Sequence, residues 1–163
     1  MYTFDTKIRV RYAEPDQMGY DHHGNYAAYF EGASTETFRQ LGISYKAMEA
    51  NGIGLPVGEM HTKFRRPARY DDLLTVRLLL RKPARGASLL FEYEIYNEAR
   101  ELLTEGHTLM VFVRTATGRP VSVPTAVQER LLPYFNEAET HGPVMPVPEI
   151  ISSDASTPAT LQK

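Results

Sequence analysis

The chain has 163 residues, 18 of them basic and 20 acidic, for a net charge of −2 and a pI near 6.2. This length suits one domain with a single core, and the near-balanced charge argues against general binding of nucleic acid or of anionic membranes. Because the chain has no cysteine, it has no disulfide, thiolate nucleophile or zinc-thiolate site. Its first residues form no apolar signal segment, and no apolar run is long enough to span a bilayer, so we expect a cytoplasmic location.

The first part of the chain predicts a strand and then a long helix. At residues 4–12, apolar positions alternate with basic ones, which indicates one buried strand face. Gly24-Asn25 are suited to begin the helix and to cap it, and Gly42 is suited to end it. A shorter helix is expected from Ser44 to Ala50. The apolar positions are Ile8, Val10 and Tyr12 in the strand and Tyr26, Tyr29, Phe30, Ala33, Thr37, Phe38 and Leu41 in the helix.

Four extended segments follow, and they predict an antiparallel sheet with one covered face. Turn sequences at Arg69–Asp72, Pro83–Gly86 and Asn97–Glu101 separate them. A strand, a helix and then consecutive strands describe an α+β fold in which the sheet wraps the helix. The segments lie around residues 55–66, 72–82, 88–97 and 103–115, with alternation clearest at Leu74, Val76, Leu78 and Leu80 and at Phe91, Tyr93 and Ile95.

The C-terminal part predicts one more helix and a tail. The helix is expected from Pro124 or Thr125 to about Tyr134, because the Thr125–Gln128 spacing fits a capping box. Residues 136–163 lose periodicity and contain several prolines and serines, so we expect a poorly structured segment there. The folded domain is therefore expected to span residues 1–135.

The segment from Asp16 to Tyr26 is the main candidate for chemistry. It places Asp16 seven residues before His23, at the expected start of the long helix. A helix start has unpaired N–H groups that can polarise a carbonyl oxygen, and a nearby carboxylate can act as nucleophile or general base. The alternative is that Asp16 only stabilises a turn. No third ligand accompanies His22 and His23 at a recognisable spacing, so neither a metal nor a cofactor is expected.

The residues of this segment and several downstream resemble the 4-hydroxybenzoyl-CoA thioesterase group of hotdog-fold proteins. The resemblance covers about residues 5–135 and implies a long helix held by a curved antiparallel sheet. It also implies dimerisation into a continuous sheet, active sites at the subunit interface and hydrolysis of an acyl-CoA thioester. The matching segments are Val10–Gly19, His22–Tyr26, Phe30-Glu31, Pro56-Val57 and Arg66–Asp72.

Carried over by position, the resemblance assigns catalytic roles to two residues, Asp16 and His23. Asp16 matches the catalytic carboxylate, which acts either as a nucleophile through a mixed anhydride or as a base on water. His23 matches the position whose backbone N–H polarises the thioester carbonyl. Tyr26 is kept as a candidate pocket residue, although its helical spacing favours the core.

Basic residues gather between positions 63 and 85, which hold eight basic and only two acidic side chains. Arginine and lysine bind phosphate, and CoA carries three phosphate groups. The resemblance places basic residues at the hairpin matching Lys82 and Arg85, and Arg65 is a further candidate for substrate binding. The alternative is a solvated strand face that protects the sheet. Asp71 and Asp72 are expected to fix the turn.

Other functions remain open from the sequence. A hotdog hydratase is disfavoured, since its Asp and His lie closer together than Asp16 and His23. A module that binds an acyl thioester without turnover would be expected to lack the Asp16 carboxylate, which is present. Acyl carrier protein in place of CoA and the identity of the acyl group, aromatic groups included, stay undetermined. The expected partners are an acyl-CoA substrate and further copies of the chain, as a homodimer or homotetramer.

Overall fold

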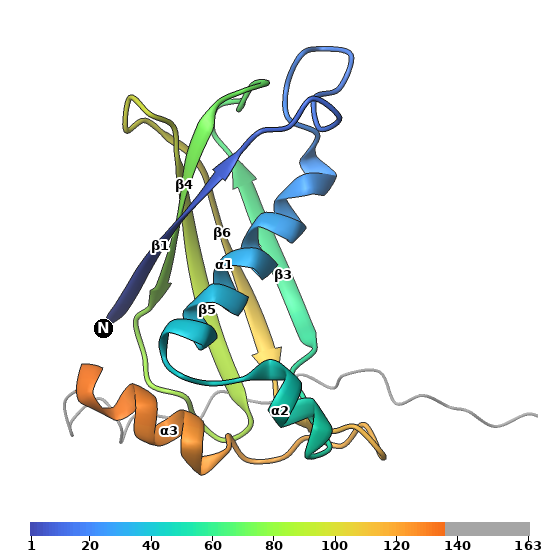
Figure 1. Cartoon of the computed structure of the whole chain (residues 1–163), viewed down its shortest axis with the longest axis vertical. Helices are drawn as coiled ribbons and strands as arrows, with labels where there is room; N and C mark the ends of the chain where they lie inside the picture. Colours follow the sequence, from blue (N-terminus) through green and yellow to red (C-terminus); the bar gives the residue numbers. More distant parts are fainter. Residues whose placement is uncertain (136–163) are drawn as a thin grey trace, which may run out of the picture.

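A computed structural model describes residues 1–135; the expected proline- and serine-containing tail, residues 136–163, lies outside them. One long helix, α1 (Tyr26–Gln40), lies across one face of an antiparallel sheet with strand order β1-β4-β5-β6-β3 (Figure 1). This is the hotdog architecture expected from the resemblance. No helix in the described part of the chain is long and apolar enough to cross a membrane. The strands are β1 (Tyr2–Arg9), β3 (Val57–Phe64), β4 (Leu73–Leu80), β5 (Ser88–Tyr96) and β6 (Leu102–Val111).

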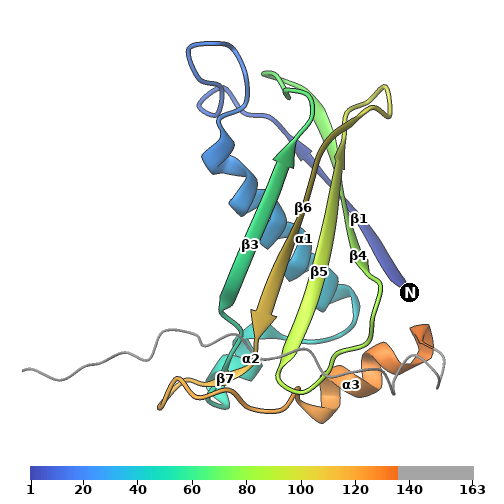
Figure 2. The same ribbon diagram turned by 180° about the vertical axis from the view of Figure 1, so that it is seen from behind.

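Shorter elements close the two ends of the sheet. The 3₁₀ turn η1 (His23–Asn25) leads directly into α1, and α2 (Tyr45–Ala50) follows it. A two-stranded sheet joins β2 (Ile53–Gly54) to β7 (Val113–Arg114). The described chain ends with α3 (Thr125–Leu131) and the 3₁₀ turn η2 (Leu132–Tyr134). Helix α3 lies at the end of the sheet opposite to the start of α1 (Figure 2).

The predicted helix ends are partly confirmed. Gly42 follows α1 with φ of 74°, a left-handed conformation that glycine adopts without strain. The Ser44 side chain accepts from Ala47 N–H and caps α2, as expected. The capping box at Thr125 is wrong: Pro124 is the N-cap and makes no side-chain cap, while the Gln128 side chain donates to Val123 O at 2.7 Å. Gln128 therefore ties α3 to the preceding loop instead of capping it.

The first strand ends earlier than the alternation predicts. After Arg9 the chain bonds to the connection before β4, with Val10 N–H donating to Asp72 O and Asp71 N–H to Val10 O. The chain then turns away from the sheet, and Tyr12 is 85% exposed, with its ring against that of Tyr70. The prediction that Tyr12 belongs to the buried face is wrong, because the hydrogen bonds of the neighbouring connection end the strand first.

The core holds α1 tightly against the middle of the sheet. Phe30 of α1 stacks on Tyr93 of β5 with ring centroids 4.2 Å apart and ring planes 9° apart. Gly106 of β6 makes this approach possible, since a Cβ there would lie 2.6 Å from His61 O and 2.8 Å from the Phe30 ring. A side chain at this position would push the helix off the sheet, and the helix start would move with it.

The two edge strands differ in what they expose. Along β1, side chains alternate between partly covered and exposed, and the exposed positions include Asp5, Lys7 and Arg9. Along β3, every residue but Thr62 is exposed, including Val57, Met60 and Phe64 at 41–50%. Charged alternation protects a strand edge from pairing, whereas an apolar exposed edge invites it. Strand β3 thus exposes apolar side chains beside Glu59, His61 and Lys63, whereas the exposed side chains of β1 are mainly charged.

The strand register sorts the loops into two ends. Arg9 pairs with Leu73 and Tyr2 with Leu80, so the loop after β1 lies at the same end as residues 65–72. The β4–β5 hairpin, residues 81–87, lies at the other end, near α3 (Figure 1). Within one chain, the start of α1 and this hairpin are thus separated by the length of the sheet.

Candidate active site

The loop between β1 and α1, residues 11–22, folds back on itself as a narrow hairpin. Asp16 N–H donates to Tyr20 O at 2.8 Å, and His22 N–H donates to Glu14 O at 3.0 Å. At the tip, Gly19 has φ of 76°, and its N–H donates to Asp16 O. This pairing fixes Asp16 at the turn of the loop, and the Glu14 carbonyl joins the loop to the start of α1 through His22 and Asn25.

The Asp16 carboxylate is exposed and only half engaged. Its Oδ1 atom accepts from Met18 N–H at 2.8 Å and from Tyr20 N–H at 3.4 Å, which is the turn bonding of an Asx residue. Its Oδ2 atom accepts no hydrogen bond from residues 1–135. The turn interpretation and the chemical interpretation are therefore compatible, since one oxygen orients the group and the other is available.

The start of α1 leaves one backbone donor available. His22 takes up two N–H groups: its Nδ1 atom accepts from Gly24 at 3.1 Å, and its carbonyl accepts from Asn25 at 2.9 Å. The His23 N–H has no hydrogen-bond partner in the part of the chain that the structure describes. Asn25 occupies the N-cap position of α1, but its side chain makes no capping bond, so the expected side-chain cap is wrong. The His22 ring caps the turn η1 instead.

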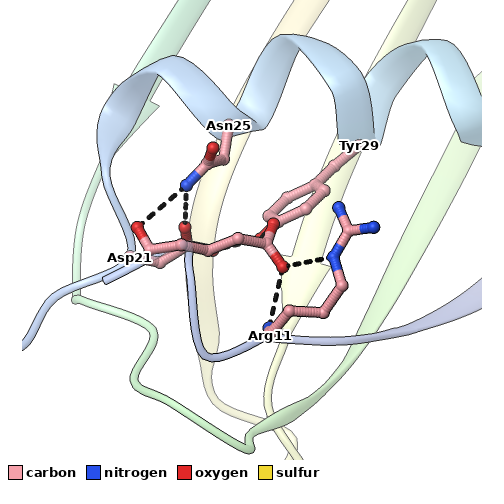
Figure 3. Close-up of polar contacts among 5 residues, drawn as sticks. Arg11, Asp21, Asn25 and Tyr29 are labelled. Atoms are coloured by element: carbon pink, nitrogen blue, oxygen red, sulfur yellow. Dashed lines mark hydrogen bonds and ion pairs between the residues drawn. The ribbon is translucent and has the colours of Figure 1, made fainter. Parts of the chain in front are cut away.

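Sequence reasoning missed a buried polar cluster directly behind this loop. The Tyr29 hydroxyl lies 2.5 Å from Asp21 Oδ2 and 2.7 Å from Glu14 Oε2. Asn25 Nδ2 donates to Asp21 Oδ1 at 2.7 Å and to Glu14 O at 3.0 Å, and Arg11 donates to Glu14 through N–H and Nε–H, both at 2.7 Å (Figure 3). Two acidic residues before a helix start, with a tyrosine in the first turn of the helix, were the available signal.

The environment shifts the acidity of this cluster in opposite directions. Burial raises the pKa of Asp21 despite the hydrogen bonds from Tyr29 and Asn25. Burial also acts on Glu14, but the hydrogen bonds from Arg11 and Tyr29 outweigh it and leave the pKa of Glu14 below its ordinary value. Burial and the two carboxyl groups raise the pKa of Tyr29, so its hydroxyl keeps its proton.

Tyr26 lies in the core, as its helical spacing favours. It is 2% exposed, and its ring contacts those of Tyr29 and Phe64 at centroid distances of 5.4 and 4.9 Å. Burial raises its pKa to about 12. Its role in substrate binding stays a prediction.

An open groove of about 640 Å³ runs along α1 toward the β3 edge. Apolar side chains dominate its lining, with the Tyr93 hydroxyl and Thr108 hydroxyl 3.0 Å apart at its floor. Its size falls in the range of small-molecule sites. The groove begins at Ala27, one helical turn after His23, and its lining includes Phe30, Tyr45, Leu55, Val57, Met60 and Met110.

Four of the eight basic residues between positions 63 and 85 form ion pairs within the described part of the chain. Arg65 contacts Glu105 at 2.5 Å and Arg66 contacts Glu101 at 3.3 Å. Arg77 binds Asp5 through two nitrogens, and Arg81 contacts Glu92 at 2.8 Å. These ion pairs favour the interpretation that the paired arginines form a solvated strand face. The role of Arg65 in substrate binding stays a prediction, and its ion pair with Glu105 argues against it.

The remaining candidates, Lys82 and Arg85, lie on the β4–β5 hairpin at the end of the sheet opposite to Asp16. The Arg85 backbone pairs with Ser88 across the turn. The structure thus brings Asp16 and His23 to one end and does not bring the predicted phosphate-binding residues to them within the chain. Among residues 1–135, no three His, Asp or Glu side chains are arranged to hold a metal ion.

Comparisons with known proteins place the chain among thioesterases. A profile of the thioesterase-like superfamily matches residues 10–131. The acyl-CoA thioester hydrolase YbgC of Escherichia coli is 32% identical over 76% of this chain and 92% of its own length. A DHNA-CoA thioesterase from Staphylococcus aureus superposes with a TM-score of 0.72 and 36% identity over 75% of this chain and 81% of that one. A 4-hydroxybenzoyl CoA thioesterase, at TM-score 0.71 and 20% identity over 78% of this chain and 97% of that one, shares the fold.

Proposed function

The chain belongs to the thioesterase-like superfamily, and we propose that it hydrolyses an acyl-CoA thioester to the free acid and CoA, with Asp16 and the His23 backbone amide as the catalytic groups. One observation carries the residue assignment. The loop that bears Asp16 is pinned beside a helix start whose His23 N–H has no partner in residues 1–135, while the neighbouring Gly24 and Asn25 N–H groups are taken up.

The proposed chemistry needs only these two groups. The His23 N–H donates to the thioester carbonyl oxygen and then to the oxyanion that forms on attack, and one such donor contributes about 3 kcal/mol of transition-state stabilisation. On the general-base route, Asp16 Oδ2 takes a proton from water as the water oxygen bonds to the carbonyl carbon. The carbon–sulfur bond then breaks, and CoA leaves as its thiolate. On the nucleophilic route, Oδ2 bonds to the carbon itself, the carbon–sulfur bond breaks and CoA leaves as its thiolate, and water then hydrolyses the anhydride to the free acid and the Asp16 carboxylate.

The groove along α1 is the proposed site of the acyl group. It begins one turn after His23, so a carbonyl bound at the His23 amide would direct its acyl substituent along the helix. Its apolar lining suits a hydrocarbon or aromatic acyl group. The groove opens at the β3 edge, where a second subunit would cover it.

A dimer through β3 would complete the site. The exposed apolar β3 edge supports antiparallel pairing of two β3 strands about a two-fold axis. Such pairing inverts one subunit relative to the other, so the partner's β4–β5 hairpin would lie at the same end as Asp16. In this arrangement Lys82 and Arg85 from one subunit bind phosphates of the CoA that is hydrolysed at the other.

The test compares Asp16→Asn with His23→Ala in a thiol-release assay on short, long and aromatic acyl-CoAs. Asp16→Asn keeps the size and the turn hydrogen bonds but loses basicity, so we expect kcat to fall at least ~10²-fold, the lower range for loss of a general base. His23→Ala keeps the backbone N–H, and we expect a much smaller loss. Near-normal turnover by Asp16→Asn together with an inactive His23→Ala would mean that the imidazole is the base.

A further inference from the structure

In the polar cluster behind the Asp16 loop, a single hydroxyl proton lies between two carboxyl groups. The Tyr29 oxygen lies 2.5 Å from Asp21 Oδ2 and 2.7 Å from Glu14 Oε2, both hydrogen-bond distances. A tyrosine hydroxyl carries one proton and can donate to only one of two carboxylates. A proton on one of the carboxyl groups would supply the second donor, which would then point to the tyrosine oxygen.

The surrounding donors decide which carboxyl carries that proton. Glu14 Oε1 accepts two hydrogen bonds from Arg11, one of them from the guanidinium, which favours the ionised form of Glu14. Asp21 is 6% exposed and forms no ion pair with a guanidinium among residues 1–135, where its Oδ1 accepts from the neutral Asn25 amide. Burial raises the pKa of Asp21, whereas the hydrogen bonds of Glu14 lower its pKa.

The resulting series of hydrogen bonds runs from Asp21 through Tyr29 to Glu14 and Arg11. With that proton on Asp21, its Oδ2 would donate to the Tyr29 oxygen and the Tyr29 hydroxyl would donate to Glu14 Oε2, which Arg11 neutralises. The other titratable groups facing Asp21 are His22, whose positive charge when protonated favours the ionised acid, and the neutral Tyr26. From the connection before β4, Asp21 N–H is bound by Ala68 O.

This series of hydrogen bonds joins the loop that bears Asp16 and the turn that bears His23 to α1. Glu14 and Asp21 flank Asp16 on the two arms of its loop, and Asp21 is two residues before His23, whereas Tyr29 is rooted in the core of α1 with 2% exposure. Building on the proposed function, we propose that Asp21 is a positioning residue, whose carboxyl, held protonated between Asn25 and Tyr29, fixes the Asp16 loop against the start of α1.

The kinetic test uses three variants of the full chain, each measured beside the wild type. Asp21→Asn reproduces the protonated acid, since its oxygen accepts from Asn25 and its NH₂ donates to Tyr29; kcat and KM should stay within about two-fold. Asp21→Ala and Tyr29→Phe each remove hydrogen bonds between Asp21, Tyr29 and Glu14. We expect kcat to fall about ten-fold or more with KM little changed, because misplaced catalytic groups slow chemistry. A loss for Asp21→Asn equal to that for Asp21→Ala, or full kcat for Tyr29→Phe, would overturn the proposal.

Two further measurements test the proton without relying on activity. At neutral pH, infrared difference spectra between wild type and Asp21→Asn should contain the carbonyl stretch of one protonated carboxyl, and its absence would contradict the proposal. Thermal unfolding gives the second: a raised folded pKa contributes stability that is full below the ordinary aspartate value near 3.9 and is lost as pH rises through the folded pKa. The melting temperature of wild type relative to Asp21→Asn should therefore fall with rising pH. If Asp16→Asn were active, the proposed function would fail while both measurements still test Asp21.

Discussion

The two ends of the sheet are built from different chemistry. At the end of Asp16, residues 11–29 bring together a tight loop, a helix start with an available N–H and a buried polar cluster. At the other end, the β4–β5 hairpin carries Lys82 and Arg85 without any acidic side chain between residues 80 and 91. In the proposed function, the first end breaks the thioester bond and the second binds the phosphates of CoA. Because the sheet separates them, the proposed function needs a second subunit, and three predictions address that need.

The largest effect is expected from a charge on the β3 edge. Phe64→Lys places two like charges at the proposed β3–β3 junction, so the dimer should dissociate and turnover should fall at least ~10²-fold, the scale of losses from misplaced catalytic geometry. Thr3→Lys on the exposed side of β1 is the matched control and should leave both properties unchanged. Light scattering and thiol release measure the two together. A wild-type chain that is monomeric and fully active would refute the two-subunit site.

An intermediate effect is expected from Arg85, and mixed dimers can locate it. Arg85→Ala should raise KM about ten-fold with little change in kcat, because one hydrogen bond to a charged group contributes about 1.5 kcal/mol. In a hybrid dimer of Asp16→Asn with Arg85→Ala, one site pairs an intact Asp16 with an intact Arg85 of the other subunit. That site should recover the wild-type KM. If Arg85 instead serves the Asp16 of its own chain, no component with the wild-type KM will appear.

The smallest effect is expected from Arg65. Its ion pair with Glu105 lies on the outer face of the sheet, where such pairs contribute about 1 kcal/mol or less. Arg65→Ala should therefore change KM for acyl-CoA by less than about two-fold, an effect that steady-state kinetics beside Arg85→Ala can resolve. A rise in KM as large as that of Arg85→Ala would instead make Arg65 a phosphate ligand, as the sequence first suggested.

The sequence predicted the elements well wherever one local pattern governed them. The helical spacing from Tyr26 to Leu41, the glycine at position 42 and the Ser44 cap all reappear in the structure. Local patterns failed where a distant segment competed for the same groups. Val10 bonds to Asp71 and Asp72, which ends β1 before Tyr12, and Gln128 bonds to Val123 O instead of completing a capping box.

The sequence alone identified the residue types and the spacing of the candidate site. It also identified the resemblance of these residues to a known family. Asp16 and His23 are seven positions apart, and a turn followed by a helix start is enough to predict that they lie near one another. Only the tertiary structure decided which groups remain available. Asp16 Oδ2 and the His23 N–H lack partners within residues 1–135, while Arg65 has one. The Asp21–Tyr29–Glu14 contacts likewise depend on the loop folding back over α1, because burial and hydrogen-bond geometry are properties of the packed chain and not of its residue order.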